Sequence, residues 1–247
     1  MASTPGQHEA AEGTPARVLP PGLRDDTWVV IAAFNEGSVI AEVAAAVRRV
    51  VPNVVVVDDG SADDTAAQAR VSATHVLKHV INRGQGASLQ TGISFALSRG
   101  ARCIVTFDAD GQHDAADIPR FVEPIAAGEA DYVLGSRFLD RESGMPWTRR
   151  LVLRLGVLFT RVVNRLPVTD AHNGFRAFSR KGAEALEISA DRMSHASQLI
   201  DLIRASGLPF KEIGVTIRYS AYSLGKGQRS SNAIRIALHH LVDKILD

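Results

Sequence analysis

The chain has little of what marks a secreted, membrane-spanning or nucleic-acid-binding protein. Its 247 residues include a single cysteine, Cys103, which excludes a disulfide framework and zinc-ligand spacing and fits a reducing compartment. Apolar runs stay well short of the roughly 18 residues that a bilayer span needs, so we expect a protein that does not cross a membrane by itself. The formal net charge of +1 gives no nucleic-acid signature.

Composition divides the chain into three parts. Residues 1–26 lack the apolar core of a signal peptide and are rich in Ala, Gly, Pro and Thr, which predicts a disordered arm. Residues 27–229 carry the regular elements and predict one α/β domain. Residues 230–247 predict a C-terminal amphipathic helix, because apolar side chains recur at helical spacing: Ile234, Leu238, Leu241 and Ile245.

Short apolar runs alternate with segments of helical period, which predicts a mostly parallel sheet with helices on both faces. Strands are expected at 28–33, 54–57, 74–78, 103–107, 131–134, 173–179 and 210–219. Helices are expected at 38–50, 63–71, 86–98, 117–127, 147–166, 193–205 and 231–246.

Polar clusters follow four of the expected strands. They are Asn35-Glu36, Asp58-Asp59, Asp108 with Asp110, and Ser136-Arg137. Ligands of parallel sheets bind outside the carboxyl ends of the strands, so we expect these clusters to lie at one edge. Helix N-capping would explain Ser61 and Asp63, but it does not explain a doubled carboxylate.

The most informative cluster is the segment Asp108-Ala109-Asp110-Gly111-Gln112-His113, directly after a buried strand. Two carboxylates this close together are costly unless a positive charge lies between them. Mg²⁺ is commonly held by one or two carboxylates together with phosphate oxygens. The segment therefore predicts a divalent cation that carries a phosphate, and a capped turn is the structural alternative.

Six segments in this order resemble family 2 glycosyltransferases with the GT-A fold. They are Ala33-Phe34-Asn35-Glu36, 57–65 (Val-Asp-Asp-Gly-Ser-Ala-Asp-Asp-Thr), 82–87 (Asn-Arg-Gly-Gln-Gly-Ala), 108–113, Gly135-Ser136-Arg137 and 170–176 (Asp-Ala-His-Asn-Gly-Phe-Arg). Within that family the chain is most similar to the polyprenyl-phosphate (dolichol-phosphate) sugar transferases, over roughly residues 28–228. The resemblance implies a Rossmann-like GT-A domain with amphipathic helices on the acceptor side and at the C-terminus.

The resemblance also implies the donor site. Its nucleotide-binding residues would be Ala33, Asn35, Glu36, Asp58, Asp59, Arg83, Asp108 and Ala109. Asp108, Asp110 and Gln112 would hold Mg²⁺ or Mn²⁺ on the diphosphate, and Asp110 is expected to be catalytic. Many relatives carry Lys where this chain has Gln85, so a charge contact to the diphosphate is absent or is supplied by Arg83.

On the acceptor side, arginines indicate a phosphate, because a guanidinium is a good planar phosphate donor. The residues expected to hold it are Ser136, Arg137, Arg149, Arg150, Arg176 and Lys226, with Arg137 also catalytic. Asp170 and Arg176 are alternatively a structural ion pair. A phosphate monoester is mostly a dianion at neutral pH and can attack directly, so a catalytic base is unnecessary; His113 is expected to order the metal loop.

Residues 147–166 place Arg150, Arg154, Arg161 and Arg165 on one face among apolar side chains. This pattern is typical of a helix on an anionic membrane surface, or of a core helix with a solvated arginine face. We expect a cytoplasmic protein, peripheral to the cytoplasmic face of a membrane. A membrane anchor is absent, removed, or supplied by a small membrane-protein partner.

The expected reaction is inverting transfer of a sugar from GDP-mannose or a UDP-hexose to undecaprenyl or dolichyl phosphate. Glu36 and Asp59 suit hydrogen bonds to either base, so the donor stays open. A glycan or protein hydroxyl is the alternative acceptor, and it requires a general base. A non-catalytic nucleotide-binding subunit and a sugar-nucleotide pyrophosphorylase are two competing hypotheses for the function; no nucleic-acid partner is expected.

Overall fold

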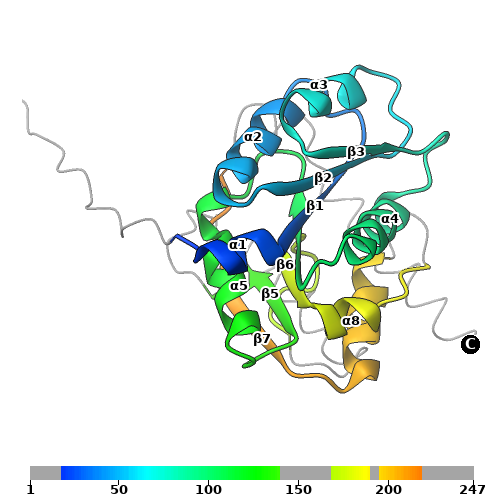
Figure 1. Cartoon of the computed structure of the whole chain (residues 1–247). Coiled ribbons are helices and arrows are strands. Elements are labelled where there is room, and N and C mark those ends of the chain that lie inside the picture. Colours follow the sequence, from blue (N-terminus) through cyan, green and yellow to red (C-terminus); the bar gives the residue numbers. More distant parts are fainter. Residues whose placement is uncertain (1–17, 140–167, 190–194, 219–247) are drawn as a thin grey trace, which may run out of the picture.

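The computed structural model describes residues 18–139, 168–189 and 195–218, and Figure 1 shows them as one sheet with helices on both faces. The strands are β1 (Thr27–Ala33), β2 (Asn53–Asp58), β3 (His75–Lys78), β4 (Cys103–Asp108), β5 (Tyr132–Ser136), β6 (Arg176–Ser179) and β7 (Phe210–Gly214). The helices are α1 (Pro21–Asp26), α2 (Ile40–Val50), α3 (Thr65–Ser72), α4 (Gln85–Ser98), the 3₁₀ turn η1 (Ala115–Asp117), α5 (Ile118–Ala126), α7 (Arg180–Glu184) and α8 (His195–Ser206). Among the described helices, none combines the length and apolar character that crossing a bilayer requires.

The sheet runs in the order β3-β2-β1-β4-β6-β5-β7. Every neighbouring pair is parallel except the two pairs that involve β6. The chain leaves β1 toward β2 and β3 on one side and continues at β4 on the other. The edge outside the carboxyl ends of β1 and β4 is therefore a topological switch point, where α/β sheets bind ligands.

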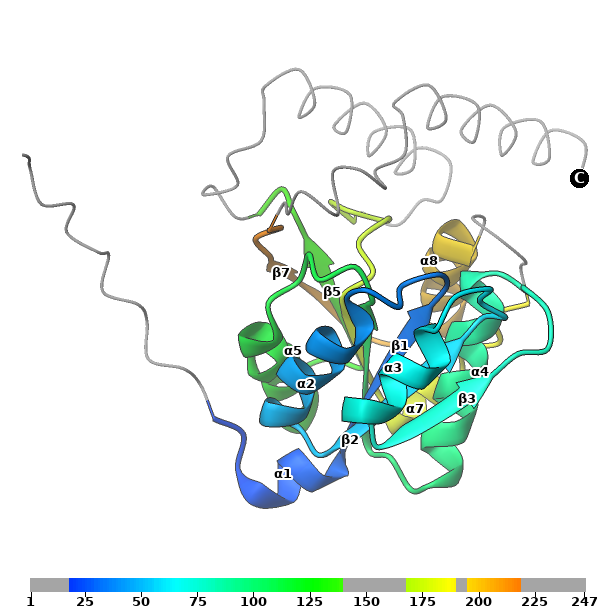
Figure 2. The same ribbon diagram turned by 90° about the horizontal axis from the view of Figure 1, so that it is seen from above.

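Both faces of the sheet are covered, which explains the unbroken apolar runs in the sequence. Val54 and Val56 of β2 pack in a core with α2 and α5, whereas Val55 and Val57 pack in a second core with α4 and α8. Figure 2 shows these two helical layers on opposite sides of the strands. Two packed faces fix the strands, and the loops at their ends are held on a rigid scaffold.

The described strands and helices confirm the predicted order, with ends that move by a few residues. The expected strand 173–179 begins at Arg176, and the strand expected at 210–219 ends at Gly214. Two short helices, α1 and α7, were not predicted. The expected helices at 147–166 and 231–246 lie outside the described residues.

Two local expectations were wrong. The end of the expected disordered arm is structured, because α1 covers Pro21–Asp26 and Leu19 is buried in the core. Ser61 is not a helix cap, because the N-cap of α3 is Asp64; the Ser61 hydroxyl accepts a hydrogen bond from the Asn35 backbone N–H. The proposed domain limits at residues 27, 229 and 230 remain predictions.

Candidate active site

All four polar clusters lie at the carboxyl edge of the sheet, as predicted, because β5 runs in the same direction as β1, β2 and β4. Three of them meet at the switch point. The register pairs Ala33 with Asp58 on β2, and it pairs Ala32 with Asp108 on β4. The ends of β1, β2 and β4 are therefore level, and the loops that follow them gather around the switch point. This arrangement brings Glu36, Asp59 and Asp108 to one edge of the sheet.

Asp108 is held by neighbours from three separate segments. Its carboxylate accepts from His113 Nε2 at 3.0 Å and from Gln85 Nε2 at 3.4 Å. A side chain at Gly174 would overlap both carboxylate oxygens, so only glycine leaves room for Asp108 there. The Asp108 side chain remains 28% exposed. The carboxylate is thus fixed in direction and still open to a ligand.

His113 supports Asp108 from within the core. Its ring is buried and lies against Phe107 and Phe175, with ring centroids 5.6 and 5.3 Å away. Nδ1 is buried without a hydrogen-bond partner in the described structure. This favours the tautomer that carries its hydrogen on Nε2 and donates it to Asp108. The expectation that His113 orders the metal loop agrees with this geometry.

Asp110 lies where negative charge accumulates. Its carboxylate accepts from the Gln112 backbone N–H at 3.0 Å. Burial raises the pKa of Asp110, and the nearby charges of Asp108 and Glu36 raise it further, whereas the Gln112 N–H and His113 lower it. The site therefore favours either a proton on Asp110 or a cation beside it.

The donor set fits a divalent cation that arrives with a phosphate. Within the described residues, no group of three His, Cys, Asp or Glu side chains could hold a metal alone. Mg²⁺ needs no such cage, because it commonly takes one or two carboxylates and completes its shell with phosphate and water. Asp108 and Asp110 meet that requirement; Gln112 as a third ligand remains a prediction.

The doubled carboxylate at the end of β2 organises the protein backbone. Asp58 is fully buried, accepts from the Ser61 N–H at 2.9 Å and lies 3.2 Å from Lys78 Nζ. Asp59 is 3% exposed and accepts from the N–H groups of Arg83 and Gly84 at 2.9 and 2.7 Å. The nucleotide contacts expected of these two carboxylates stay predictions, and any such contact must share them with these partners.

His79 is a further member of this group that sequence reasoning missed. Its Nδ1 lies 2.8 Å from Asp59, and its Nε2 lies 3.0 Å from the Thr91 hydroxyl of α4. The imidazole thereby ties Asp59 to α4, whose first residue, Gln85, reaches Asp108. The sequence feature that could have indicated His79 is its position directly after an edge strand.

Two of the other expected nucleotide residues, Asn35 and Glu36, make contacts between the loops that follow β1 and β2. Asn35 has a φ of 55°, and its side chain accepts from the Ala62 N–H at 3.0 Å. The Glu36 N–H donates to Thr65, while Ala33 and Ala109 are buried. The Arg83 side chain is exposed. These contacts lock the β1 and β2 loops together beside the carboxylates.

On the acceptor side, Arg137 already forms an ion pair with a carboxylate. Its Nε and Nη2 donate to the two oxygens of Asp170 at 2.6 and 2.8 Å. Ser136 is fully buried, and its hydroxyl lies 2.6 Å from that of Thr169. The suggested ion pair between Asp170 and Arg176 was wrong, because Arg137 is the residue that pairs with Asp170.

Arg176 lies beneath the site. It is 3% exposed, and its Nη2 donates to the Ala171 carbonyl at 3.0 Å. Burial lowers the pKa of Arg176 to about 10, and the charges of Asp108 and Asp170 oppose that shift. A phosphate in solution does not reach this guanidinium without rearrangement, so its expected acceptor contact has no support in the geometry.

The remaining acceptor residues, Arg149, Arg150 and Lys226, lie outside the described residues.

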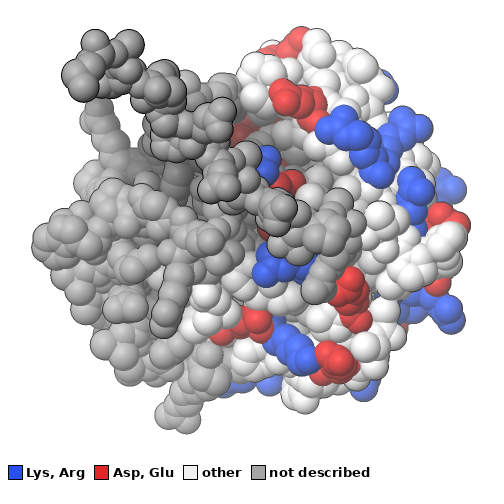
Figure 3. Space-filling view, turned by 90° about the vertical axis from the view of Figure 1, so that its left-hand side faces the viewer, with Lys and Arg blue, Asp and Glu red and all other residues white. Residues whose placement is uncertain are grey.

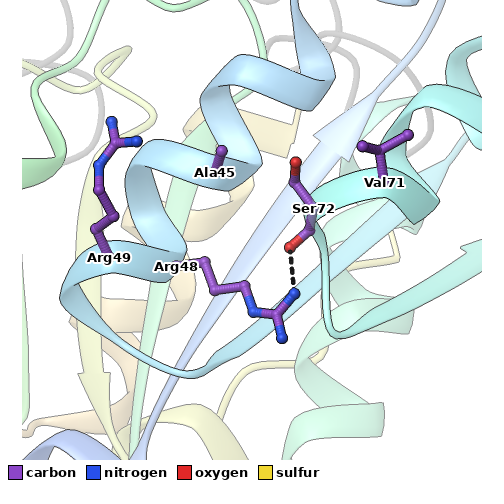
Figure 4. A pocket seen from close by; sticks show the side chains of 5 residues that line it. All are labelled: Ala45, Arg48, Arg49, Val71 and Ser72. Carbon is purple, nitrogen blue, oxygen red and sulfur yellow. Dashed lines mark hydrogen bonds between the residues drawn. The ribbon is translucent and has the colours of Figure 1, made fainter.

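One surface hollow, of about 290 Å³, lies away from these residues. Figure 4 shows it between α2 and α3, where Arg48 donates to the Ser72 carbonyl at 3.2 Å. Its lining comes from the last turns of both helices, which run back from the carboxyl edge. The hollow therefore plays no part in the candidate site.

Comparison with known proteins agrees with the geometry. The family model described as Glycosyl transferase family 2 matches residues 28–186. Polyprenol monophosphomannose synthase of Mycolicibacterium smegmatis is 29% identical over 252 residues, which cover 98% of this chain and 94% of that protein. The UDP-N-acetylglucosamine–dolichyl-phosphate N-acetylglucosaminyltransferase of Methanococcus voltae is 30% identical over 246 residues, which cover 89% of this chain and 98% of that protein.

A solved structure shows the same fold. The crystal structure of glucosyl-3-phosphoglycerate synthase from Mycobacterium tuberculosis, in complex with Mn²⁺ and uridine-diphosphate-glucose, superposes with a TM-score of 0.67 at 20% identity. The superposition covers 89% of this chain and 77% of that one. It shows that the seven-stranded sheet and its flanking helices form a GT-A fold.

Proposed function

The chain belongs to glycosyl transferase family 2, and on that premise we propose that it moves a sugar from a nucleotide diphosphate to a polyprenyl phosphate, with inversion. The observation that carries the proposal is the group of carboxylates at the switch point. Asp108, Asp110 and Glu36 lie close enough for Asp108 and Glu36 to raise the pKa of Asp110. A site built in this way is suited to a ligand that brings its own cation.

Asp108 and Asp110 would hold Mg²⁺ or Mn²⁺, with Gln112 as a further ligand. When bound, the metal would neutralise charge on the leaving nucleoside diphosphate. His113, Gln85 and Gly174 set the direction of Asp108. The loops around Asn35, Glu36 and Asp59 would receive the nucleotide, and the exposed Arg83 would lie beside the diphosphate.

The acceptor is proposed from the relatives and from Arg137. Two relatives are named for transfer to polyprenol or dolichyl phosphate. A phosphate dianion needs no general base, so a single displacement that inverts the anomeric carbon suffices. Arg137 would contact the phosphate while Asp170 fixes its guanidinium. Because the acceptor is a membrane lipid, we place the protein at the cytoplasmic membrane surface.

The test is turnover by the purified full chain. The assay supplies UDP- and GDP-sugars, Mg²⁺ or Mn²⁺ and a short-chain prenyl phosphate, and it follows sugar in the organic phase and release of nucleoside diphosphate. We expect both products in equal amounts, and none with the matching prenol that lacks the phosphate. Formation of pyrophosphate, transfer to a glycan or protein hydroxyl instead, or no turnover with any donor would refute the proposal.

A further inference from the structure

The exposed large apolar side chains are concentrated at the edge of the sheet that carries the site. Six such residues are exposed among those described, and four of them follow the carboxyl ends of β1, β3 and β5. They are Phe34, Val80, Ile81 and Leu139. Single exposed apolar residues are ordinary on protein surfaces. Val80 and Ile81 differ because they are adjacent and are 98% and 68% exposed.

The loop that carries this pair is held firmly from inside. The His79 N–H donates to the Asp58 carbonyl at 2.8 Å, and Asp59 accepts from the Arg83 and Gly84 N–H groups. At Gly60, an added Cβ would lie 2.7 Å from the Ile81 carbonyl carbon, so the two backbones pack closely. Val80 and Ile81 are therefore presented to solvent on a fixed backbone.

The two charged residues nearest to this pair in the sequence are both cations, Lys78 and Arg83, and Lys78 lies 3.2 Å from the buried Asp58 carboxylate. Between Thr65 and Phe107 the chain contains no Asp or Glu. Of the five Lys and Arg residues in that interval, Lys78 and Arg83 are next to the loop, whereas Arg99 and Arg102 follow α4 at the opposite edge of the sheet, where Arg102 pairs with Asp26. Figure 1 shows the loop from β3 to α4 at the outer limit of this flank, and Figure 3 shows the opposite side, where acidic and basic side chains are mixed.

We propose that the Val80–Ile81 loop inserts into an anionic lipid bilayer and helps hold the site against the membrane. An apolar tip with Lys78 before it and the exposed Arg83 after it matches an acyl interior beneath negatively charged headgroups. A lipid surface also suits the position of the loop, which follows a strand at the same edge as Asp108. The inference rests on the proposed function, because a polyprenyl phosphate resides in such a bilayer.

The direct test places a polarity-sensitive fluorophore on Ile81→Cys in the full chain. Cys103 does not interfere, because it is 2% exposed and burial raises its pKa to about 12. Phosphatidylcholine vesicles with phosphatidylglycerol should shift the emission to shorter wavelength, and phosphatidylcholine alone should shift it less. The matched control is Val71→Cys, whose native side chain is 72% exposed on α3 and whose label should stay in water.

A second variant separates membrane docking from catalysis. The double change Val80→Ser, Ile81→Ser should lower partition onto anionic vesicles by roughly fivefold, while turnover of a water-soluble short-chain prenyl phosphate stays at the wild-type rate. Failure of the proposed function would instead abolish turnover in both proteins and leave vesicle insertion unchanged. A label at residue 81 that stays in water on anionic vesicles, or an unchanged partition of the double variant, overturns the docking inference.

Discussion

The two halves of the sheet differ in whether the protein balances its own charges. At the ends of β1 and β4, carboxylates face one another, and the pKa of Asp110 is raised by burial and by Asp108 and Glu36. At the end of β5, a guanidinium is already matched to a carboxylate in the bidentate pair of Arg137 and Asp170. The first half needs a positive charge that a ligand can bring, whereas the second is balanced by the protein itself.

This difference separates what each half contributes. Binding of a cation relieves repulsion in the donor half, so affinity there should depend strongly on metal. An acceptor phosphate must instead share Arg137 with Asp170. The acceptor half should therefore orient the phosphate more than it strengthens phosphate binding. Each of the following changes alters one half and leaves the other as its reference.

The largest effect is expected from Asp110→Asn. The change removes a charge that the metal-bound donor requires while keeping the shape of the side chain, so turnover should fall by about 10²–10³-fold. The matched control is Asp117→Asn, which removes a carboxylate paired with Arg120 on the nearby helix. That control should keep wild-type turnover; a value for Asp110→Asn within threefold of wild type would remove Asp110 from the site.

In the acceptor half, Asp170→Ala should destabilise the fold. Asp170 is 2% and Arg137 is 20% exposed in their side chains, so the change removes the bidentate carboxylate from a largely buried guanidinium, at a cost of about 3 kcal/mol. Urea unfolding measures the loss. The exposed pair of Arg180 and Glu184 is the control, because Glu184→Ala should cost less than about 1 kcal/mol. Equal losses in the two variants would contradict the account.

A smaller effect is expected from Gly174→Ala. The added methyl group would occupy the space of the Asp108 carboxylate, so that side chain must turn away from the donor. Turnover should fall by about tenfold, which corresponds to roughly 1.4 kcal/mol, while the circular dichroism spectrum stays unchanged. Gly22→Ala is the control, since an added Cβ there has no atom within 4 Å. Unchanged turnover in Gly174→Ala would show that the Asp108 direction is unimportant.

The smallest effect is a pH dependence of stability without metal. Because the pKa of Asp110 is raised above 3.8, its contribution to stability is fully present at lower pH and is lost as pH rises through the folded-state pKa. Asp110→Asn lacks this titration and should become relatively more stable than wild type over that rise. Thermal unfolding across the pH series measures the difference, and a difference that is constant with pH contradicts the repulsion.

Sequence patterns predicted that the polar clusters after β1, β2 and β4 would meet at one edge, because parallel strands with level ends bring their following residues together. The contacts of Asp58 and Asp59 were harder to predict from the sequence. Their partners, Lys78 and the loop at 79–84, come close to them only because β3 pairs with β2. The acceptor half was harder. Arg176 is the first residue of β6, the antiparallel strand between β4 and β5, and it is buried there. Arg137 therefore pairs with Asp170, although Arg176 is nearer to Asp170 in the sequence.

The most direct test of the central claim is calorimetric binding of UDP and GDP to the wild-type chain, with Mg²⁺ and with a chelator. We predict that one of the two nucleotides binds with Mg²⁺, and that the chelator or Asp110→Asn weakens that binding strongly. Equal nucleotide affinity with and without metal would contradict the account, because the carboxylates at the switch point would then have no cation to receive.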